Sequence, residues 1–262
     1  MIPSSSLDLL RHAEAIVREA GSIILADWQK PKDVRFKGRI DLVTRTDMAV
    51  EAFLTERLRR LLPGADMLAE ETASATQPGE LTWIIDPVDG TTNFAHGFPF
   101  VCTSVALWRD GRVVLGIVNA PVLGECFTAA EEEGAWLNGQ PISVSREEDL
   151  ESSLIATGFP YGIREKVEAI TANLTRMLVH TRGVRRAGSA ALDLAYTACG
   201  RFDGFYESDL KPWDTAAGWL LVREAGGRVS SYDSKIPYTL GLPSILASNG
   251  RIHEAMSALI GR

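Results

Sequence analysis

The sequence predicts a layered fold of mixed sheets and helices, in the α+β or mixed α/β class, formed by one domain over residues 1–262. Short β-rich runs separated by turn signals fill the segment from Phe100 to Val144, and strands alternate with helices after Leu150. Strands that are grouped first and then alternate with helices are typical of layered folds. We expect an N-terminal half with an antiparallel sheet, 1–150, and a C-terminal α/β half, 151–262.

Two amphipathic helices are predicted near the N-terminus. Apolar residues recur at helical spacing from Leu7 to Gln29, with Ser6 as a candidate N-cap and Pro31 as a stop signal. A second helix is expected to begin near Thr46 and to end at Pro63-Gly64.

The later elements follow from turn signals and from periodicity. Between Phe100 and Val144, the pairs Asp110-Gly111, Leu123-Gly124, Glu133-Gly134 and Asn138-Gly139 separate short apolar runs, which predicts an antiparallel meander. In the C-terminal half we expect strands at Leu154–Thr157, near Val184, at Phe202–Glu207 and at Ile245–Ala247, and helices at Arg164–His180, Ser189–Cys199, Thr215–Ala225 and Ile252–Ile260.

Charge and cysteine content narrow the class of protein. A net charge of −7 disfavours nonspecific nucleic-acid binding, which requires a basic surface. Cys102, Cys126 and Cys199 form no Cys-x-x-Cys pair, which argues against zinc and suits a reducing compartment. The N-terminus lacks the basic and apolar blocks of a signal peptide, and no apolar run reaches the roughly 20 residues of a membrane span. We therefore expect a cytoplasmic protein that binds neither nucleic acid directly nor a membrane.

Two carboxylates stand at the end of a predicted buried strand. Asp86 and Asp89 follow the apolar run Trp83-Ile84-Ile85 and precede a turn at Gly90. Neighbouring carboxylates repel each other and resist leaving water, and a hard divalent cation with oxygen ligands compensates both effects. The sequence therefore indicates a metal site.

Other acidic residues lie in apolar or turn contexts. Singly, each has an ordinary explanation: Asp47 as a helix-start residue, Glu70-Glu71 as a solvated strand end, Asp214 as an N-cap and Asp89-Gly90 as a plain turn. Magnesium and calcium sites, however, are assembled from several carboxylates and a backbone carbonyl of different segments. Glu70, Asp86, Asp89 and Asp214 would suffice, and the rigid Pro87 could direct the Val88 carbonyl toward the same cation.

The residues after Gly90 suggest an anion site beside the metals. Thr91-Thr92-Asn93-Phe94 could begin a short helix or nest, whose free N–H groups would point toward the cations. A phosphate between metal ions and a helix N-terminus would meet the positive field that it needs, and Thr91 could add a hydroxyl. This combination predicts metal-assisted hydrolysis of a phosphate ester.

Five motifs in order resemble a known family. They are W-I-I-D-P-V-D-G-T-T-N-F at Trp83–Phe94, W-D-T-A-A-G with R-E-A-G-G at Trp213–Gly227, D-L-V-T-R-T-D at Asp41–Asp47, A-E-E at Ala69–Glu71 and G-S-A-A-L-D-L at Gly188–Leu194. From about Leu9 to Ile260 the chain resembles the inositol monophosphatase family, nearest its bacterial branch. The resemblance implies a five-layer αβαβα sandwich, a homodimer, lithium sensitivity and dependence on two or three Mg²⁺ ions per site.

The resemblance also implies residue roles. Glu70, Asp86 and the Val88 carbonyl would hold one metal, and Asp86, Asp89 and Asp214 a second. A third, weaker ion would depend on Glu70 and water. Glu70 and the Thr91–Asp47 pair would position and deprotonate the attacking water. The Gly90 and Thr91 amides would hold the phosphate, and Lys37 resembles the family's mobile active-site lysine.

The substrate implied by the resemblance is a small phosphate monoester, foremost inositol monophosphate. Glu207, seven residues before Asp214, matches the family's carboxylate for ring hydroxyls, and Gly188 and Ala190 match the backbone that lines the same pocket. A surface position at a strand end is the alternative for Glu207. The segment 156–160 follows the bacterial pattern and lacks the serine with which animal enzymes contact inositol.

Three alternative substrates and one alternative of another class remain open. Histidinol phosphate, fructose bisphosphate and nucleotide 3′-phosphates are substrates of relatives that share the metal motifs, and Glu207 could bind an amine as readily as a hydroxyl. A hypothesis of another class is that the chain is an accessory partner of the bacterial transcription machinery. Its support in the sequence is a small basic cluster formed by Arg182, Arg185 and Arg186. Arg185 and Arg186 could equally be interfacial or solvated.

Overall fold

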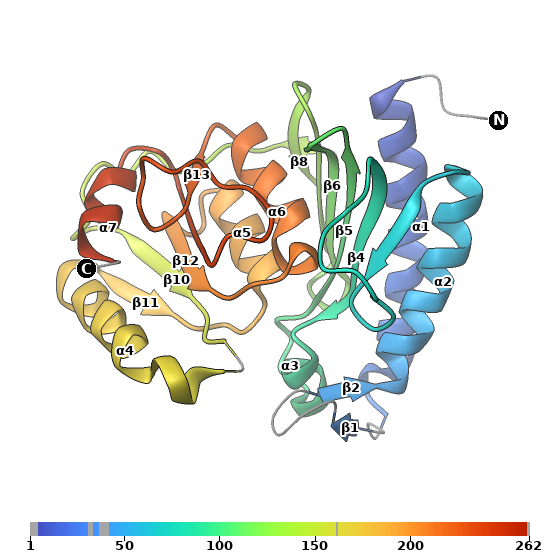
Figure 1. Ribbon diagram of the computed structural model, residues 1–262, viewed down its shortest axis with the longest axis horizontal. Coiled ribbons are helices and arrows are strands. Elements are labelled where there is room, and N and C mark those ends of the chain that lie inside the picture. The colour runs from blue at the N-terminus through green and yellow to red at the C-terminus, as the bar shows by residue number, and fades with distance from the viewer. Residues whose placement is uncertain (1–4, 31–33, 37–41, 161, 261–262) are drawn as a thin grey trace.

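The computed structural model describes residues 5–30, 34–36, 42–160 and 162–260. Its helices and sheets are stacked in five alternating layers (Figure 1). Two helices cover one face of a large sheet, two further helices lie between this sheet and a smaller one, and the last pair covers the smaller sheet from outside. This arrangement confirms the expected αβαβα sandwich.

The large sheet has seven strands in the order β3-β4-β5-β6-β7-β8-β9. All neighbouring pairs are antiparallel except β3 and β4, which are parallel. The predicted meander is thus confirmed from β5 onward, whereas the expectation of an antiparallel N-terminal sheet was wrong at the β3 edge, where β3 and β4 are parallel. The strands are β3 (Asp66–Ala69), β4 (Leu81–Asp89), β5 (Cys102–Arg109), β6 (Arg112–Ala120), β7 (Glu125–Ala130), β8 (Gly134–Leu137) and β9 (Gln140–Pro141).

The smaller sheet has five strands in the order β11-β10-β12-β14-β13 and contains both parallel and antiparallel pairs. Its strands are β10 (Leu154–Thr157), β11 (Gly183–Arg185), β12 (Gly204–Ser208), β13 (Arg228–Ser230) and β14 (Ser244–Ser248). The expected strands near these positions are confirmed, whereas β13 was not predicted because its three residues are too short for a periodic pattern. A separate two-stranded pair, β1 (Val34–Phe36) and β2 (Leu42–Thr44), precedes α2.

The outer helices of the large sheet are α1 (Ser6–Trp28) and α2 (Arg45–Leu61). Apolar stripes of both helices pack against β4 to β7, and fully buried Val17, Ile24 and Leu54 belong to this core. The side chain of Ser5, not Ser6, caps α1 by accepting a hydrogen bond from the Asp8 amide. N-cap preferences depend on residue type, so the sequence alone could not decide which of two adjacent serines caps the helix.

The central helices are α5 (Ala190–Ala198) and α6 (Pro212–Glu224). Both are almost wholly buried between the sheets, where small residues allow close packing. A Cβ atom at Gly218 would stand only 2.5 Å from the Leu194 Cβ, so a larger residue would separate α6 from α5. Helix α6 begins at Pro212, three residues before the predicted start, because proline is well suited to a first helical position.

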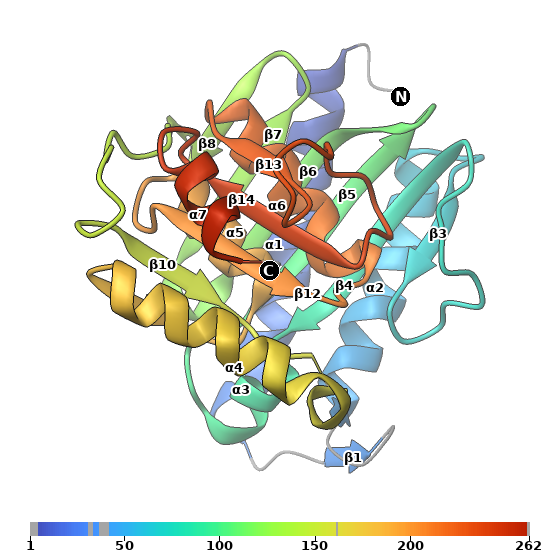
Figure 2. The ribbon, with the colours of Figure 1, turned by 60° about the vertical axis from the view of Figure 1, so that its left-hand side comes forward.

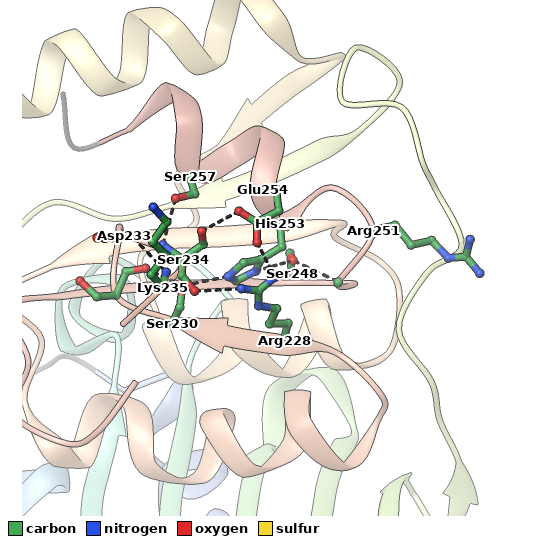
Figure 3. A network of polar contacts seen from close by, with 12 residues as sticks. Arg228, Ser230, Asp233, Ser234, Lys235, Ser248, Arg251, His253, Glu254 and Ser257 are labelled. Carbon is green, nitrogen blue, oxygen red and sulfur yellow. Dashed lines mark hydrogen bonds and ion pairs between the residues drawn. The ribbon is translucent and has the colours of Figure 1, made fainter. Parts of the chain in front are cut away.

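The outer face of the small sheet is covered by α4 (Ile163–His180) and α7 (His253–Leu259) (Figure 2). A buried histidine anchors α7. The Ser248 hydroxyl lies 2.8 Å from His253 Nδ1, and the Ser230 hydroxyl lies 2.8 Å from Nε2 (Figure 3). One imidazole therefore ties α7 to both β13 and β14.

Within the described residues, no helix is both long and apolar enough to cross a membrane.

Candidate active site

The end of β4 carries the first two acidic residues of the site. Residues 82–88 of this strand are buried, and the pairing with β5 shifts in register between Asp86 and Asp89. Pro87 lies within the shift, and its carbonyl accepts a hydrogen bond from the Thr103 hydroxyl at 2.9 Å. The irregularity interrupts the regular alternation of side chains. Both carboxylates consequently reach one cavity, which Val88 also lines.

A tight turn joins β4 to the short helix α3 (Thr91–His96), which confirms the expected helical start. Gly90 has a φ of 94°, and a Cβ atom there would lie 3.0 Å from the Phe100 carbonyl oxygen. The Asn93 side chain fastens the turn by donating to the Phe100 and Ala187 carbonyls, both at 2.8 Å. Since Ala187 precedes α5, this amide links the two halves of the chain at the site.

Asp47 and Thr91 meet beneath this turn. Asp47 accepts hydrogen bonds from the amide and hydroxyl of Thr44 and so completes a capping box of α2. The Thr91 hydroxyl lies 3.2 Å from Asp47 Oδ1 and 3.1 Å from the Val88 carbonyl, to either of which it can donate. Burial raises the pKa of Asp47. Asp47 thus has both the structural role that its sequence position suggested and the predicted contact with Thr91.

Asp89 is held by the N-terminal turn of α5. Its Oδ2 atom accepts hydrogen bonds from the Ser189 hydroxyl and from the Ala191 amide, both at 2.7 Å. Ser189 is itself the N-cap of α5. These contacts leave Oδ1 of Asp89 as the oxygen that is available to a further ligand.

Asp214 comes from the first turn of α6. Its Oδ2 accepts a hydrogen bond from the Lys211 amide at 2.6 Å, so Asp214 lies at the third helical position rather than at the N-cap. The Ser104 hydroxyl of β5 donates to the Trp213 carbonyl at 3.1 Å and fixes this turn against the large sheet. Glu70 follows β3, and its amide donates to the Ile85 carbonyl of β4. Glu70 and Asp214 line the same cavity as Asp86 and Asp89.

The acidic side chains interact strongly with one another. Burial raises the pKa of Asp86 and of Asp214 well above the ordinary range, and their acidic neighbours raise both further. The pKa of Asp89 rises to about 6, chiefly because of burial, although Ser189 and the Ala191 amide oppose that shift. Together, these shifts identify a place where negative charge is costly unless a cation is nearby.

The donor set fits a divalent cation. Asp86 Oδ1 is buried and has no hydrogen-bond partner among the described residues. In the part of the chain that the structure describes, no three His, Cys, Asp or Glu side chains are arranged to hold a metal ion as they stand. Asp89 and Asp214 each direct one oxygen to protein donors instead. A hard cation would supply the missing partner of Asp86 and offset the repulsion, and carboxylate oxygens are its preferred ligands.

A cavity of about 340 Å³ extends from the acidic cluster toward the small sheet. Gly188, Ala190 and Glu207 line it, as the resemblance implied, together with Gly90 and Thr91. Glu207 is 7% exposed, so the alternative of a solvated strand end was wrong. Burial raises the pKa of Glu207 to about 8, and the positive charge of Arg186 counteracts this rise.

Several residues of the cavity were not predicted as site residues. Ser189, Asp193 and Phe159 line the cavity. Arg186 also lines it, although the sequence suggested this residue only as part of a surface for a partner. The start of a predicted helix at Ser189 was a usable signal, since a helix N-terminus favours a nearby negative charge such as a carboxylate. Lys37 lies outside the described residues, so its predicted role stays a prediction.

Comparisons with known proteins agree with this geometry. A family model described as "Inositol monophosphatase family" matches residues 7–261. The chain is 44% identical to an inositol-1-monophosphatase of Synechocystis sp., over 97% of this chain and 89% of that protein. It is 39% identical to the Nus factor SuhB of Escherichia coli, over 95% and 94% of the two chains. A solved inositol monophosphatase from Anabaena (Nostoc) sp. is 40% identical and superimposes with a TM-score of 0.86, covering 95% and 94%. The chain therefore belongs to the inositol monophosphatase family.

Proposed function

We propose that this inositol-phosphate phosphatase hydrolyses inositol monophosphate to inositol and phosphate with two or three Mg²⁺ ions. The buried carboxylate cluster supports the proposal most strongly. Asp86 and Asp89 come from β4 and Asp214 comes from α6, and their pKa values are raised both by burial and by one another or by Glu70. Burying such a cluster is costly, and a strongly positive ligand would offset that cost.

Each acidic residue has a place in the proposed site. Glu70, Asp86 and the Val88 carbonyl would hold one ion, and Asp86, Asp89 and Asp214 the other. Bound Mg²⁺ would lower the pKa of the attacking water and offset negative charge on the phosphate. Ser189 and the Ala191 amide fix the orientation of Asp89 before any cation binds, because both donate to its Oδ2.

Proton transfer in the proposed reaction depends on Thr91 and Asp47. The Thr91 hydroxyl can pass its proton toward Asp47 Oδ1, which lies 3.2 Å away, and can in turn accept one from the attacking water. The raised pKa of Asp47 suits a temporary proton acceptor better than that of an exposed aspartate would. Glu70 borders the same space from the end of β3 and would orient the water.

The alcohol part of the substrate would occupy the cavity toward the small sheet. The Gly90 and Thr91 amides at the start of α3 would hold the phosphate, and Glu207 would accept hydrogen bonds from ring hydroxyls. Glu207 lines the cavity beside Asp214, which supports this assignment. Histidinol phosphate, fructose bisphosphate and nucleotide 3′-phosphates are competing substrates.

Phosphate release by the purified protein tests this proposal. The assay would compare inositol 1-phosphate, histidinol phosphate, fructose 1,6-bisphosphate and adenosine 3′,5′-bisphosphate, each with Mg²⁺ and with EDTA. We expect Mg²⁺-dependent release with the highest kcat/KM for inositol 1-phosphate. A clear preference for another ester would show that inositol 1-phosphate is not the preferred substrate. Phosphate release at the same rate in EDTA as in Mg²⁺ would overturn the metal assignment.

A second function is favoured by one comparison. The relative from Escherichia coli is named a Nus factor, and in this chain Arg182, just before β11, and Arg185, at its end, are exposed. We infer an accessory role with the transcription machinery that uses this surface rather than the metal site. Co-purification of RNA polymerase factors with both wild type and Asp89→Asn would support this role. Loss of co-purification in Asp89→Asn but not in Arg185→Ala would contradict it.

A further inference from the structure

Asp193 is a buried acid that the proposed chemistry does not use. It lies in the first turns of α5, and only 1% of its surface is exposed. Its Oδ1 atom has no hydrogen-bond partner among the described residues, yet Asp193 lines the same cavity as Glu207. A buried carboxylate oxygen without a hydrogen-bond donor costs free energy. A ligand in this cavity that donates a hydrogen bond to Asp193 would offset that cost.

Glu207 is the second acid of this part of the cavity. It comes from β12, opposite the start of α5, and its charge raises the pKa of Asp193. A Cβ atom at Gly158 would overlap the Glu207 carboxylate. Glycine at this position therefore lets the Glu207 carboxylate lie against Gly158, in the wall of the cavity that Asp193 also lines.

Arg186 sets the charge at the rim of the cavity. Its guanidinium lies 5.4 Å from the centre of the Phe159 ring, and its positive charge lowers the pKa of Asp89, Asp193 and Glu207. It also packs against Gly188, where a Cβ atom would stand 2.8 Å from its Nη1. Asp193, Glu207 and Arg186 line one part of the cavity, which we call the recess. The recess thus combines two buried acids inside with one cation at its edge.

We propose that Asp193 is a further substrate-binding residue, which pairs with Glu207 to bind two hydroxyl groups of a neutral polyhydroxy alcohol phosphate. This inference rests on the proposed phosphatase activity and specifies its substrate class. Carboxylates are acceptors, and hydroxyl groups supply the donors that both side chains need. A hydroxyl pair also satisfies the buried oxygen of Asp193 without adding charge.

The charges of the recess disfavour the two other substrate classes. A second phosphate group in the recess would face Asp193 and Glu207 and would be repelled by each of them that is ionised. A cationic ammonium would be attracted to the acids, and the Arg186 guanidinium, whose charge already lowers the pKa of both, would reduce that attraction. A neutral polyol meets neither penalty, which separates it from bisphosphates and from amino alcohol phosphates.

Asp193→Ala and Asp193→Asn test the inference with two substrates. Inositol 1-phosphate carries ring hydroxyls, whereas p-nitrophenyl phosphate has none. We expect kcat/KM for inositol 1-phosphate to fall at least tenfold more than kcat/KM for p-nitrophenyl phosphate in Asp193→Ala, mainly through KM, with a smaller difference in Asp193→Asn. The matched control is Asp110→Asn, which removes the same charge from an exposed turn at the far end of β5.

Each outcome separates the inference from the proposed function. If wild type releases no phosphate from any ester, the proposed function fails. If wild type is active and both substrates lose the same factor in Asp193→Ala, Asp193 is structural and the inference is overturned. Wild-type preference for histidinol phosphate or fructose 1,6-bisphosphate over inositol 1-phosphate would overturn the substrate class. Thermal unfolding of each variant identifies a loss that is caused by misfolding.

Discussion

At the scale of single residues, the site is defined by carboxylates that the protein itself only partly satisfies. Asp89 has two donors on Oδ2, Asp214 has one, and Asp86 has a buried oxygen with none among the described residues. Removing one of these charges should affect activity and folding in opposite directions. Their mutual repulsion opposes folding in the absence of a cation, whereas the proposed catalysis requires all of them.

Asp89→Asn should abolish Mg²⁺-dependent turnover, with a loss of at least about 100-fold, because a proposed metal ligand and a negative charge are lost. The free energy of unfolding in EDTA at pH 8 should stay equal or increase, since asparagine keeps an oxygen for Ser189 and Ala191. Phosphate release and urea unfolding measure the two quantities. Turnover at the wild-type rate would contradict the metal assignment.

Ser189→Ala should weaken metal binding without removing a ligand. The variant loses one of two donors to Asp89 Oδ2, and such outer contacts typically change metal affinity by 10–100-fold. We expect the Mg²⁺ concentration for half-maximal activity to rise about tenfold. Ser152→Ala, which removes a serine–aspartate hydrogen bond on a distant turn, is the matched control and should leave this concentration unchanged. An unchanged value in Ser189→Ala would show that Ser189 does not position Asp89.

The acidic residues could be predicted as site residues from the sequence because their motifs lie at strand ends and helix starts. Asp193 could not be chosen in this way, since its position in an apolar helix gives no sign of whether it faces a cavity or a neighbouring helix. The orientation of Ser189 likewise depends on Asp89, which lies 100 residues away in the chain. Contacts of this kind are set by tertiary packing and have no local pattern.

At the scale of elements, the turn between β4 and α3 places the acidic cluster next to a helix start. Its glycine is required for two reasons: the φ of 94° is unfavourable for other residues, and a Cβ atom would press on the Phe100 and Gly188 carbonyls. The turn was predicted from Asp89-Gly90, whereas the register shift that precedes it was not. Strand irregularities depend on the partner strand, which local sequence does not reveal.

Gly90→Ala should therefore lower the free energy of unfolding by about 2–4 kcal/mol, which combines backbone strain with the two close contacts. Gly97→Ala is a matched control at the other end of α3, because Gly97 also has a positive φ but has nothing within 4 Å of a Cβ atom. It should cost only about 1 kcal/mol. Equal costs in urea unfolding would show that the Phe100 and Gly188 contacts do not matter.

Helix α7 gives the fold a pH dependence of its own. Burial, with a smaller effect of Arg228, lowers the pKa of His253 from 6.5 to about 4, while both ring nitrogens contact serine hydroxyls (Figure 3). The unfolded chain then binds a proton that the folded chain does not between these values. The free energy of unfolding should fall as pH decreases from about 6.5 to 4, by up to roughly 3 kcal/mol.

His253→Gln isolates this contribution from that of the buried acids, whose raised pKa values act with the opposite sign. The difference in unfolding free energy between wild type and variant should shrink as pH falls from 6.5 to 4. A parallel pH profile of the two proteins would contradict the assignment. NMR titration of the His253 ring gives an independent check, with an expected pKa near 4.

At the scale of the whole molecule, the five layers bring the two sheets together around α5 and α6, and the site lies where these helices begin. The large sheet supplies Asp86 and Asp89 from β4, α6 supplies Asp214, and the small sheet supplies Glu207 from β12. The sequence predicted this layered class from its grouped and alternating strands. It did not predict the parallel β3–β4 pair, because pairing direction depends on distant partners.

The central claim is that the buried carboxylates form a magnesium site for hydrolysis of a polyol monophosphate. The most direct measurement is phosphate release from inositol 1-phosphate by wild type during a Mg²⁺ titration, with Asp214→Asn assayed in parallel. We predict no release in EDTA, saturable activation of wild type by Mg²⁺ and no activation of Asp214→Asn. Release by wild type that is independent of Mg²⁺, or full activation of Asp214→Asn, would contradict the claim.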